Sequence, residues 1–369
     1  MKILVTGAKG FIGKNLIAEL KNQKYNNIYE YDIESTLDDL EQYTKDCDFV
    51  FHLAGVNRPK DEKEFMEGNF GFTSTLLDLL KKYNNYCPIM LSSSIQAALD
   101  NPYGKSKKAE EDLIFSYAKE TDAKVLVYRF PNVFGKWCRP NYNSAIATFC
   151  NNIAHDLDIV VNDHGVVMKL VYIDDVIEEL IKALNGKEKH VGNFCEVPVA
   201  QSITLGEIVD LIYSFKNSRE ELSIPDMSNE FTKKLYSTYL SYLPKHMFNY
   251  PLKMNVDNRG SFTEFIRTPD RGQLSINIIK PGIIKGNHWH HTKNEKFLVV
   301  SGKGVIRFRK AGSDEIIEYY VSGDKLEVVD IPTGYTHNIE NLGDMDMVTI
   351  MWANECYNPD KPDTVFLEV

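Results

Sequence analysis

The chain begins with a short apolar run and then reads Thr6-Gly7-Ala8-Lys9-Gly10-Phe11-Ile12-Gly13, with three glycines spaced three residues apart. The run Lys2–Thr6 predicts a β-strand, and the apolar periodicity of Gly13–Leu20 predicts a helix. Glycines at such a turn let the backbone bend tightly and approach a pyrophosphate, while the start of the helix offers unpaired N–H groups. An ordinary glycine-rich turn is the alternative, but the position at the head of a βαβ unit favours cofactor binding. The residues predicted to bind a phosphate-bearing cofactor are Gly7, Lys9, Gly10, Phe11, Ile12 and Gly13.

The alternation of short β-rich runs with longer amphipathic segments continues to about residue 242. This pattern is typical of a parallel sheet covered by helices on both faces. The segment Lys105–Ala118 shows the clearest further helical periodicity. The other expected strands are Asn27–Tyr31, Asp48–Leu53, Ile89–Ser93, Lys124–Arg129 and Lys169–Ile173. The first part of the chain is therefore predicted to be a doubly wound α/β fold.

The pattern breaks near two prolines, Pro244 and Pro251, which fix φ and remove amide donors. We expect a domain boundary there, with one domain over residues 1–243 and another over residues 252–369, because 369 residues exceed what one core usually supports. Beyond the boundary, short strand-like runs alternate with Gly, Pro and Asn turns, which predicts an all-β domain. The runs are Gln273–Ile279, Lys296–Val300, Gly304–Arg309, Lys325–Val329 and Met347–Trp352.

The composition, with 43% hydrophobic and 25% charged residues, is that of a globular protein. A formal net charge of -10 argues against a protein that coats nucleic acid, because neutralising phosphates needs an excess of Lys and Arg. No signal-peptide pattern and no apolar span of about 20 residues are present. The six cysteines have no CxxC or disulfide-like spacing, which indicates reduced thiols. We therefore expect a cytoplasmic protein with neither a nucleic-acid nor a membrane partner.

Tyr103 and Lys107 are four residues apart and follow Ser94, which lies at the end of an expected strand. On a helix this spacing places the Lys107 ammonium beside the Tyr103 phenol, where it would lower the phenol pKa. A tyrosine tuned in this way can protonate a carbonyl oxygen as a hydride arrives, while a serine hydroxyl holds that oxygen. A packed aromatic beside a solvated lysine is the alternative.

Asp32 ends the second expected strand, where its carboxylate could accept hydrogen bonds from the adenosine ribose of NAD. Lys9 points to the opposite preference, because a cation in the glycine turn could pair with the 2′-phosphate of NADP. The two residues favour different cofactors, and both are candidates for contact with the ribose.

These motifs together resemble the extended short-chain dehydrogenase/reductase family over the first 240 or so residues. The further matching motifs are His52-Leu53-Ala54-Gly55, Asn69 ahead of Thr73, and Arg129-Phe-Pro-Asn132-Val-Phe-Gly135. The resemblance implies a Rossmann-like fold, catalysis by Ser94, Tyr103 and Lys107, and cofactor contacts from Tyr103, Lys107 and the stretch Leu53, Ala54 and Gly55. It also implies that Asn132 and Arg129 lie near a sugar nucleotide. Family members that dehydrate sugars carry an Asp-Glu pair after the catalytic serine or threonine, and Ile95-Gln96 stand there in this chain, so dehydration is not expected.

The all-β part contains a dense cluster of potential metal ligands. His288 and His290 alternate along an expected strand, Glu295 can return from the next strand, and His337 follows some forty residues later. Three imidazoles and one carboxylate suit Zn, Mn, Fe or Ni. Scattered surface histidines are the alternative. His291 is left out, because alternation turns it to the opposite face.

This arrangement resembles the two-motif pattern of the cupin superfamily over about the last 115 residues, which implies a jelly-roll barrel holding a divalent metal, with zinc favoured. In the second motif, Gly323 stands farther from Pro332 than is usual. We expect a longer hairpin there, with the ligand set unchanged.

Over its full length the chain resembles the bifunctional capsular polysaccharide enzymes of the CapF type, on the route to UDP-N-acetyl-L-fucosamine. The resemblance implies that the cupin domain epimerises C3 of a UDP-linked 4-keto-6-deoxy sugar and that the amino-terminal domain then reduces C4 with NADPH. The product would be UDP-2-acetamido-2,6-dideoxy-L-talose. The candidates for the base of the epimerisation are Lys280, Lys285, Glu264, Asp330 and Tyr335.

Pairing of the cupin domains through edge strands would cover unpaired backbone groups, so we expect a homodimer. Two rival hypotheses stay open. One is a reductase fused to a metal-dependent cupin oxygenase or isomerase that acts on another small molecule, and the other is a non-enzymatic sensor of the nicotinamide ratio.

Overall fold

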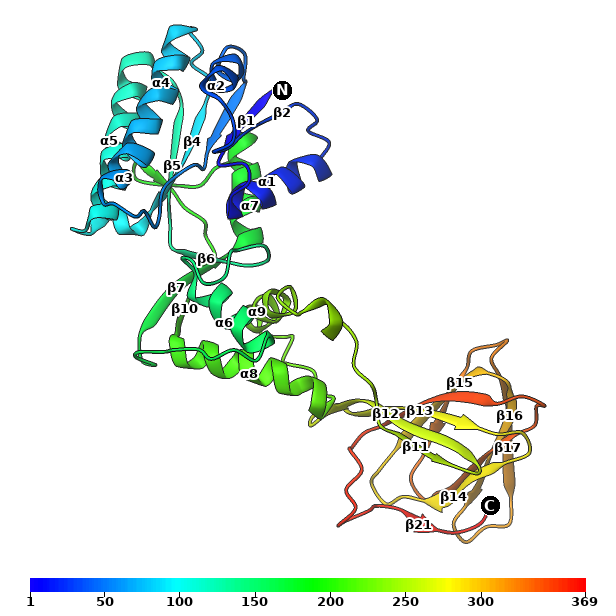
Figure 1. The fold of residues 1–369 in the computed structure, drawn as a ribbon. Helices are drawn as coiled ribbons and strands as arrows, with labels where there is room; N and C mark the ends of the chain where they lie inside the picture. Colours follow the sequence, from blue (N-terminus) through cyan, green and yellow to red (C-terminus); the bar gives the residue numbers. More distant parts are fainter. The chain divides into compact units, whose positions relative to one another are not determined.

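The computed structural model describes all 369 residues and forms two compact units (Figure 1). The first unit comprises Met1–Ser214 and Ser228–Pro244, and the second comprises Phe215–Met227 and Lys245–Val369. The second unit therefore takes in a segment that precedes the two prolines of the expected boundary. No helix has the length and apolar character needed to cross a bilayer.

The first unit is built on a seven-stranded sheet with the order β2-β1-β3-β4-β5-β9-β8, in which only β8 runs antiparallel to its neighbour. The strands are β1 (Ile3–Thr6), β2 (Ile28–Tyr31), β3 (Phe49–His52), β4 (Ile89–Ser94), β5 (Val125–Phe130), β8 (His190–Val191) and β9 (Phe194–Cys195). The chain passes from β1 to β2 on one side and then returns to place β3 on the other. The carboxyl ends of β1 and β3 thus form the switch point at which doubly wound folds bind their ligands.

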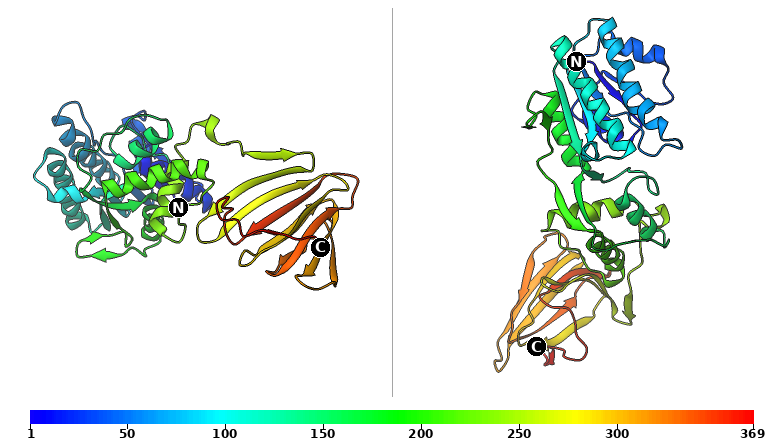
Figure 2. Two further views of the ribbon diagram at one scale, coloured as in Figure 1. Left: turned by 90° about the horizontal axis from the view of Figure 1, so that it is seen from below. Right: turned by 90° about the vertical axis from the view of Figure 1, so that its left-hand side faces the viewer.

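Helices cover both faces of this sheet (Figures 1 and 2). One face packs against α1 (Phe11–Asn22) and α7 (Ile173–Leu184), and both contribute fully buried leucines to one apolar cluster. The opposite face packs against α2 (Leu37–Thr44), α4 (Phe72–Lys82) and α5 (Pro102–Thr121). The prediction of a Rossmann-like, doubly wound domain is confirmed.

A smaller three-stranded sheet, with the order β10-β7-β6, completes the first unit. Its strands are β6 (Asn132–Phe134), β7 (Val167–Tyr172) and β10 (Gln201–Thr204), and the remaining α-helices are α3 (Lys63–Phe65), α6 (Ala145–Ala154), α9 (Glu230–Leu240) and α8 (Leu205–Glu221), of which the residues from Phe215 onward count with the second unit. Of the three strands only β7 was expected from the sequence, because β6 has only three residues and the residues of β10 are exposed or half-buried, which leaves no clear apolar pattern.

The second unit consists of two antiparallel sheets, which confirms its all-β class. The six-stranded sheet contains β11 (Met254–Asp257), β12 (Gly260–Thr268), β13 (Gly272–Ile279), β20 (Met347–Ala353), β15 (Glu295–Ser301) and β18 (Val328–Ile331). The five-stranded sheet contains β17 (Ile316–Ser322), β16 (Lys303–Lys310), β19 (Tyr335–Asn341), β14 (Ile284–Trp289) and β21 (Val365–Phe366). Buried side chains from both sheets share one core, including Phe297 and Ile339.

The expected closed barrel is not formed. No ladder joins the two sheets, and each keeps two edge strands, β11 and β18 in one and β17 and β21 in the other. A closed barrel would have no edges. The sequence pattern gives the alternation along each strand but carries no information on whether the last strands meet.

Candidate functional site

The glycine turn lies at the switch point of the large sheet. Gly7 has a φ of +69°, and a Cβ placed there would lie 2.8 Å from the backbone nitrogen of Ala54, which follows β3. Helix α1 begins after Gly10, and no side chain caps it, so the N–H groups of its first turn stay available to an anion. A Cβ at Gly13 would come within 2.2 Å of the Gly7 carbonyl oxygen. Only glycine therefore permits this close approach of helix and turn.

The two residues with opposite cofactor preferences both lie beside this turn. The Asp32 carboxylate accepts hydrogen bonds from the backbone N–H groups of Lys9 (2.6 Å) and Ile33 (2.8 Å). The Lys9 ammonium forms an exposed ion pair with Glu34. Asp32 thus connects the glycine turn to the end of β2, and the Lys9 ammonium is the positive charge beside the turn.

Helix α5 places Tyr103 and Lys107 one turn apart, as the spacing predicted. The helix is capped by Asn101, whose side chain accepts a hydrogen bond from the Gly104 N–H at 2.7 Å, and Pro102 occupies its first turn. Burial raises the pKa of the Tyr103 phenol, while Lys107 and a hydrogen bond with Ser94 oppose the rise. The expected lowering of the Tyr103 pKa by Lys107 is therefore outweighed by burial.

Lys107 has a partner that the sequence did not reveal. Its ammonium lies 2.5 Å from the carboxylate of Glu110, and the two side chains are 4% and 0% exposed. Glu110 also accepts a hydrogen bond from the Thr73 hydroxyl at 2.9 Å. Glu110 is three residues beyond Lys107 on the same helix, and this spacing is the signal that could have identified the pair.

The buried network extends from Glu110 to the motif after β3. His52 lies between the hydroxyls of Thr6 and Thr73, 2.7 Å from each. Burial lowers the pKa of His52 to about 4, although Glu110 acts in the opposite direction. His52 is thus neutral at physiological pH, and the charge of Lys107 is balanced by Glu110 alone.

Asn69 connects the same region to α5. Its side chain accepts a hydrogen bond from the Val56 N–H at 2.9 Å and donates one to the Ser106 hydroxyl at 2.9 Å. A Cβ placed at Gly55 would lie 3.0 Å from the Asn69 side-chain oxygen. The segment Leu53-Ala54-Gly55, which the sequence assigned to cofactor contact, is therefore held against the helix that carries the tyrosine and the lysine.

Arg129, which the sequence predicted to lie near a sugar nucleotide, has a carboxylate partner in the structure. Its guanidinium binds the fully buried Glu111 through two hydrogen bonds of 2.8 and 2.6 Å and stacks over the Phe194 ring at 4.0 Å. A bidentate pair with a buried carboxylate fixes the guanidinium in place. Arg129 stays a predicted substrate-side residue, with the Nε and Nη2 edge of its guanidinium committed to Glu111. Asn132 lies on β6, is exposed, and donates a hydrogen bond to the Lys169 carbonyl at 3.2 Å.

The second unit brings His288, His290, Glu295 and His337 together. One ligand atom from each lies within 4.8 Å of all the others, and three of the four side chains are buried. The Glu295 carboxylate is 3.6 Å from Nε2 of His290 and 3.4 Å from Nε2 of His337. These are too long for direct hydrogen bonds, and the facing nitrogen and oxygen atoms have no other partner. Buried polar atoms left unpartnered around a common point fit a cation.

The protonation of this cluster also suits a metal. Burial lowers the pKa of His288 to about 4, and the neighbouring His337 and His290 act in the same direction. Burial alone would raise the pKa of Glu295, but His290, His337 and Lys293 hold it well below its usual range. A neutral imidazole and an ionised carboxylate are the forms that bind divalent metals. The four residues could therefore hold Zn, Mn, Fe or Ni.

A β-bulge sets the direction of His288. The ladder between β14 and β19 shifts at Gly286, where φ is +109°, and then pairs His288 with His337. His290 lies just beyond the end of β14 rather than within the strand, so plain alternation does not place it. His291 is exposed, and its ring packs on Trp289 with centroids 4.5 Å apart, away from the cluster.

The five candidates for a base in this unit differ in their surroundings. Lys280 and Asp330 are exposed, and Asp330 pairs with Lys296. Lys285 is half-buried, and its ammonium donates hydrogen bonds to the Asn277 side chain at 2.8 Å and to the Ile278 carbonyl at 3.0 Å. Burial lowers the pKa of Lys285. The other two candidates, Glu264 and Tyr335, are half-buried as well.

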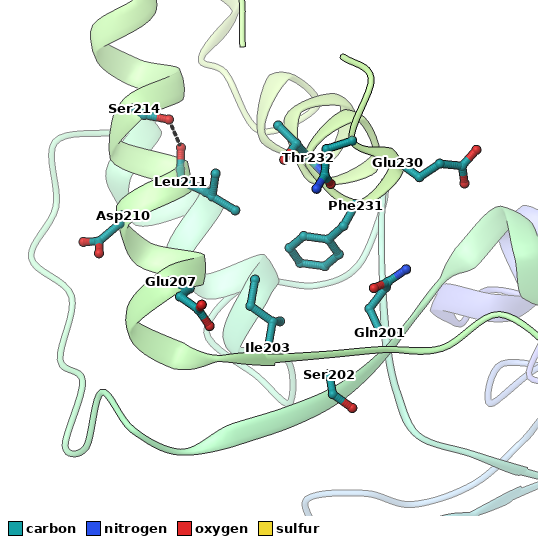
Figure 3. Close-up of a pocket in the computed structure, with 11 residues that line it drawn as sticks. Gln201, Ser202, Ile203, Glu207, Asp210, Leu211, Ser214, Glu230, Phe231 and Thr232 are labelled. Carbon is teal, nitrogen blue, oxygen red and sulfur yellow. Dashed lines mark hydrogen bonds between the residues drawn. The ribbon is translucent and has the colours of Figure 1, made fainter. Parts of the chain in front are cut away.

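A cavity of about 660 Å³ lies elsewhere, between β10, α8 and α9 (Figure 3). Its wall carries three carboxylates, Glu207, Asp210 and Glu230, and no lysine or arginine. The Phe231 ring points into its middle (Figure 3). An acidic wall repels a diphosphate, so this cavity is not a candidate nucleotide-sugar site.

Comparison with known families agrees with the two units. The model described as "NAD dependent epimerase/dehydratase family" matches residues 3–194, and the model described as "Polysaccharide biosynthesis C-terminal domain" matches residues 255–365. The chain is thus a reductase/epimerase-type enzyme of a family that uses a nicotinamide cofactor.

Individual relatives are similar to this chain over nearly its whole length. The chain is 60% identical to the crystal structure of the capsular polysaccharide assembling protein CapF from Staphylococcus aureus, with a TM-score of 0.95 and complete coverage of both chains. It is 42% identical over 364 residues to the UDP-2-acetamido-2,6-beta-L-arabino-hexul-4-ose reductase of Pseudomonas aeruginosa, covering 99% of this chain and 98% of that protein. The chain belongs to the CapF-type family.

A more distant likeness concerns the fold only. The UDP-glucuronic acid 4-epimerase of Bacillus cereus, solved with NAD, is 20% identical with a TM-score of 0.55, covering 66% of this chain and 96% of that one.

Proposed function

We propose that residues 1–243 reduce the C4 ketone of a UDP-linked 4-keto-6-deoxy-N-acetylhexosamine with NADPH. The observation that carries this proposal is the placement of Tyr103 one helical turn from Lys107, with Ser94 at the end of β4 near enough to lower the pKa of the phenol. The reductase from P. aeruginosa, whose name specifies a 4-ketohexose linked to UDP, supports the choice of substrate.

Each residue has a distinct part in the reduction. The Ser94 hydroxyl donates a hydrogen bond to the ketone oxygen, and Tyr103 gives that oxygen a proton as negative charge develops on it. A bound nicotinamide supplies the hydride. Lys107 holds a positive charge beside the phenolate that remains, and Glu110 keeps that ammonium in position. Asn132 is proposed to contact the sugar nucleotide, because its side chain is exposed on β6.

The preference for NADPH is assigned to Lys9. It is the cation next to the glycine turn, and its present partner, Glu34, is exposed and held only by a surface ion pair. Water screens both charges of such a pair, so a 2′-phosphate can displace the carboxylate. Asp32 is occupied by two backbone N–H groups, which weakens it as the determinant of ribose binding.

We further propose that residues 252–369 epimerise C3 of the same sugar before the reduction. A ketone at C4 acidifies the hydrogen at C3, and a base can remove it if the enolate oxygen is stabilised. A divalent metal held by His288, His290, Glu295 and His337, with zinc favoured, supplies positive charge for that purpose. Return of the proton to the other face inverts the centre.

The order of the two reactions follows from their chemistry. Reduction removes the ketone that makes C3 acidic, so it traps the inverted centre, and the product is UDP-2-acetamido-2,6-dideoxy-L-talose. This product would be a precursor of a capsular polysaccharide, in line with the CapF relative from S. aureus. We place the reaction in the cytoplasm, where nucleotide sugars are made.

A homodimer is proposed for the second unit. The face of the six-stranded sheet that points away from the shared core carries Leu274, Ile276 and Ile278 of β13, beside Ile350 and Trp352 of β20. These apolar side chains are only half-buried, and pairing with a second copy would remove them from water.

The assignment of the reduction is tested by NADPH oxidation with the UDP-linked keto sugar as substrate. Tyr103→Phe should lower the rate by about 100- to 10,000-fold, because it removes the proton donor. Tyr86→Phe, at an exposed tyrosine, is the matched control and should keep the wild-type rate. Lys9→Ala should raise KM for NADPH and leave KM for NADH unchanged, whereas Lys14→Ala on the exposed side of α1 should change neither. A Tyr103→Phe enzyme with full reductase activity would refute the assignment.

A further inference from the structure

The loop that joins two of the proposed metal ligands has no regular secondary structure of its own. His290 and Glu295 stand at its ends, and residues 291–294 lie between β14 and β15. Because both ends carry ligand atoms, the direction of this loop decides whether those atoms converge.

The backbone N–H groups of this loop meet a single carboxylate from the far end of the chain. One oxygen of Asp363 accepts a hydrogen bond from the His291 N–H at 2.9 Å. The other accepts hydrogen bonds from the N–H groups of Thr292 at 2.7 Å and Lys293 at 2.8 Å, and from the Thr292 hydroxyl at 3.2 Å. Consecutive N–H groups that point the same way form a concave anion site, and here a side chain of the protein fills it.

The same residue also contacts a proposed metal ligand directly. Nδ1 of His290 forms a hydrogen bond with the backbone carbonyl oxygen of Asp363. A carbonyl can only accept, so Nδ1 must carry the hydrogen, and the lone pair of His290 lies on Nε2. Nε2 is the atom that faces Glu295 without a hydrogen-bond partner. The contact therefore sets both the tautomer and the orientation that a metal needs.

Neighbouring contacts hold the loop to the same carboxy-terminal segment. The Asn354 side chain accepts a hydrogen bond from the Asn294 N–H at 3.0 Å and donates one to the Thr292 carbonyl at 3.3 Å. After Asp363, β21 pairs with β14 and places Phe366 opposite His288. Three of the four proposed ligands, His288, His290 and Glu295, thus lie on or beside segments that the last sixteen residues hold in place.

We propose that Asp363 is the positioning residue of the metal site, which holds the 291–294 loop through its carboxylate and fixes Nε2 of His290 toward the metal through its carbonyl. This inference rests on the proposed metal site but is independent of the reaction proposed for it. Partners of this kind typically contribute about 10- to 100-fold to metal affinity.

The test is the affinity for zinc, measured by competition with a chromogenic chelator on full-length protein stripped of metal. Asp363→Ala keeps the backbone carbonyl that meets His290 but removes the carboxylate that holds the loop, so neither the loop nor that carbonyl stays fixed and zinc binding should weaken by about 10- to 100-fold. Asp363→Asn should weaken zinc binding less than Asp363→Ala, because the amide keeps one oxygen that can accept a hydrogen bond. It should still weaken binding, because the amide NH₂ group faces backbone N–H groups and cannot accept from them. Asp360→Ala is the matched control, since it removes an exposed carboxylate three residues earlier, and it should leave the affinity unchanged.

Two further readouts separate positioning from folding. The absorption of bound cobalt should change in intensity in the Asp363 variants, because the geometry of the ligands changes. The circular dichroism spectrum of the metal-free Asp363 variants should match that of the metal-free wild type, which shows that the chain is folded. If Asp363→Ala and Asp363→Asn both bind zinc as tightly as the wild type, the inference is wrong. If the wild type itself binds no zinc, the metal site proposed above fails instead.

Discussion

The buried pair between Lys107 and Glu110 makes the stability of the first unit sensitive to a single atom change. In Glu110→Gln the side chain keeps its shape and can still accept a hydrogen bond from the Thr73 hydroxyl. It loses the negative charge that lies 2.5 Å from the Lys107 ammonium. The substitution therefore measures the effect of the charge on stability without changing the packing.

The size of the effect follows from burial. Neither side chain is more than 4% exposed, so water screens the uncompensated ammonium very little. Removing one partner of such a pair costs about 3 to 5 kcal/mol. For a unit of this size 1 kcal/mol shifts Tm by about 2 to 4 °C, so Tm should fall by about 6 to 20 °C. In the double variant Glu110→Gln/Lys107→Met no charge remains buried, and most of the loss should be recovered.

Differential scanning calorimetry on the full-length protein measures this effect. The two units can unfold in separate transitions, and zinc, which should shift only the transition of the second unit, tells them apart. Glu120→Gln at the exposed end of α5 is the control and should change Tm by less than about 2 °C. If Glu110→Gln also left Tm within that margin, or if the double variant were no more stable than the single one, the claim that Glu110 balances Lys107 would be refuted.

Three further predictions concern pH, metal and the second ion pair. His52 has a pKa of about 4 in the folded chain and about 6.5 when unfolded, so the unfolded state binds one more proton between these two pH values. The free energy of unfolding should therefore fall by about 3 kcal/mol as the pH drops from 6.5 to 4. His52→Asn should make this free energy depend less on pH, which urea titrations at several pH values would measure. Zinc at about 100 times its Kd should stabilise the second unit by about 2.7 kcal/mol in calorimetry, and His290→Ala should abolish the shift. Arg129→Met should destabilise the first unit by about 3 kcal/mol, because it leaves the buried Glu111 carboxylate without its partner; a rise in KM for the keto sugar would support the predicted contact of Arg129 with the sugar nucleotide, and an unchanged KM would exclude it.

The sequence predicted the central strands well, because strands buried on both faces must be continuously apolar. The expected strands at β1, β3 and β4 agree with the structure to within one residue at either end. The edge strands of the second unit were harder to predict. The outermost strand β17 (Ile316–Ser322) is largely exposed and gave no clear pattern, and β18 begins three residues later than the expected Lys325. A strand with only one neighbour packs against fewer residues, so its sequence shows a weaker apolar pattern.

The residues of the candidate sites also divide into those that the sequence revealed and those that it did not. The proposed metal ligands were found because three histidines and one glutamate stand at characteristic spacings. Asp363 was missed because it acts through backbone groups more than seventy residues away, and such contacts leave no side-chain motif. Glu110 was missed because acidic and basic residues three apart on a helix usually indicate a solvated face. Burial turned that ordinary pattern into an internal ion pair, and burial is a property of the fold.

Hydrogen exchange at the sugar ring tests the division of labour between the two units most directly. The UDP-linked 4-keto-6-deoxy-N-acetylhexosamine is incubated with the enzyme in deuterated water without NADPH and followed by proton NMR. We predict that deuterium enters C3 in the wild type and in Tyr103→Phe but not in His290→Ala, and that C4 is reduced only when NADPH is added. Exchange at C3 that required Tyr103 and ignored His290 would contradict the account.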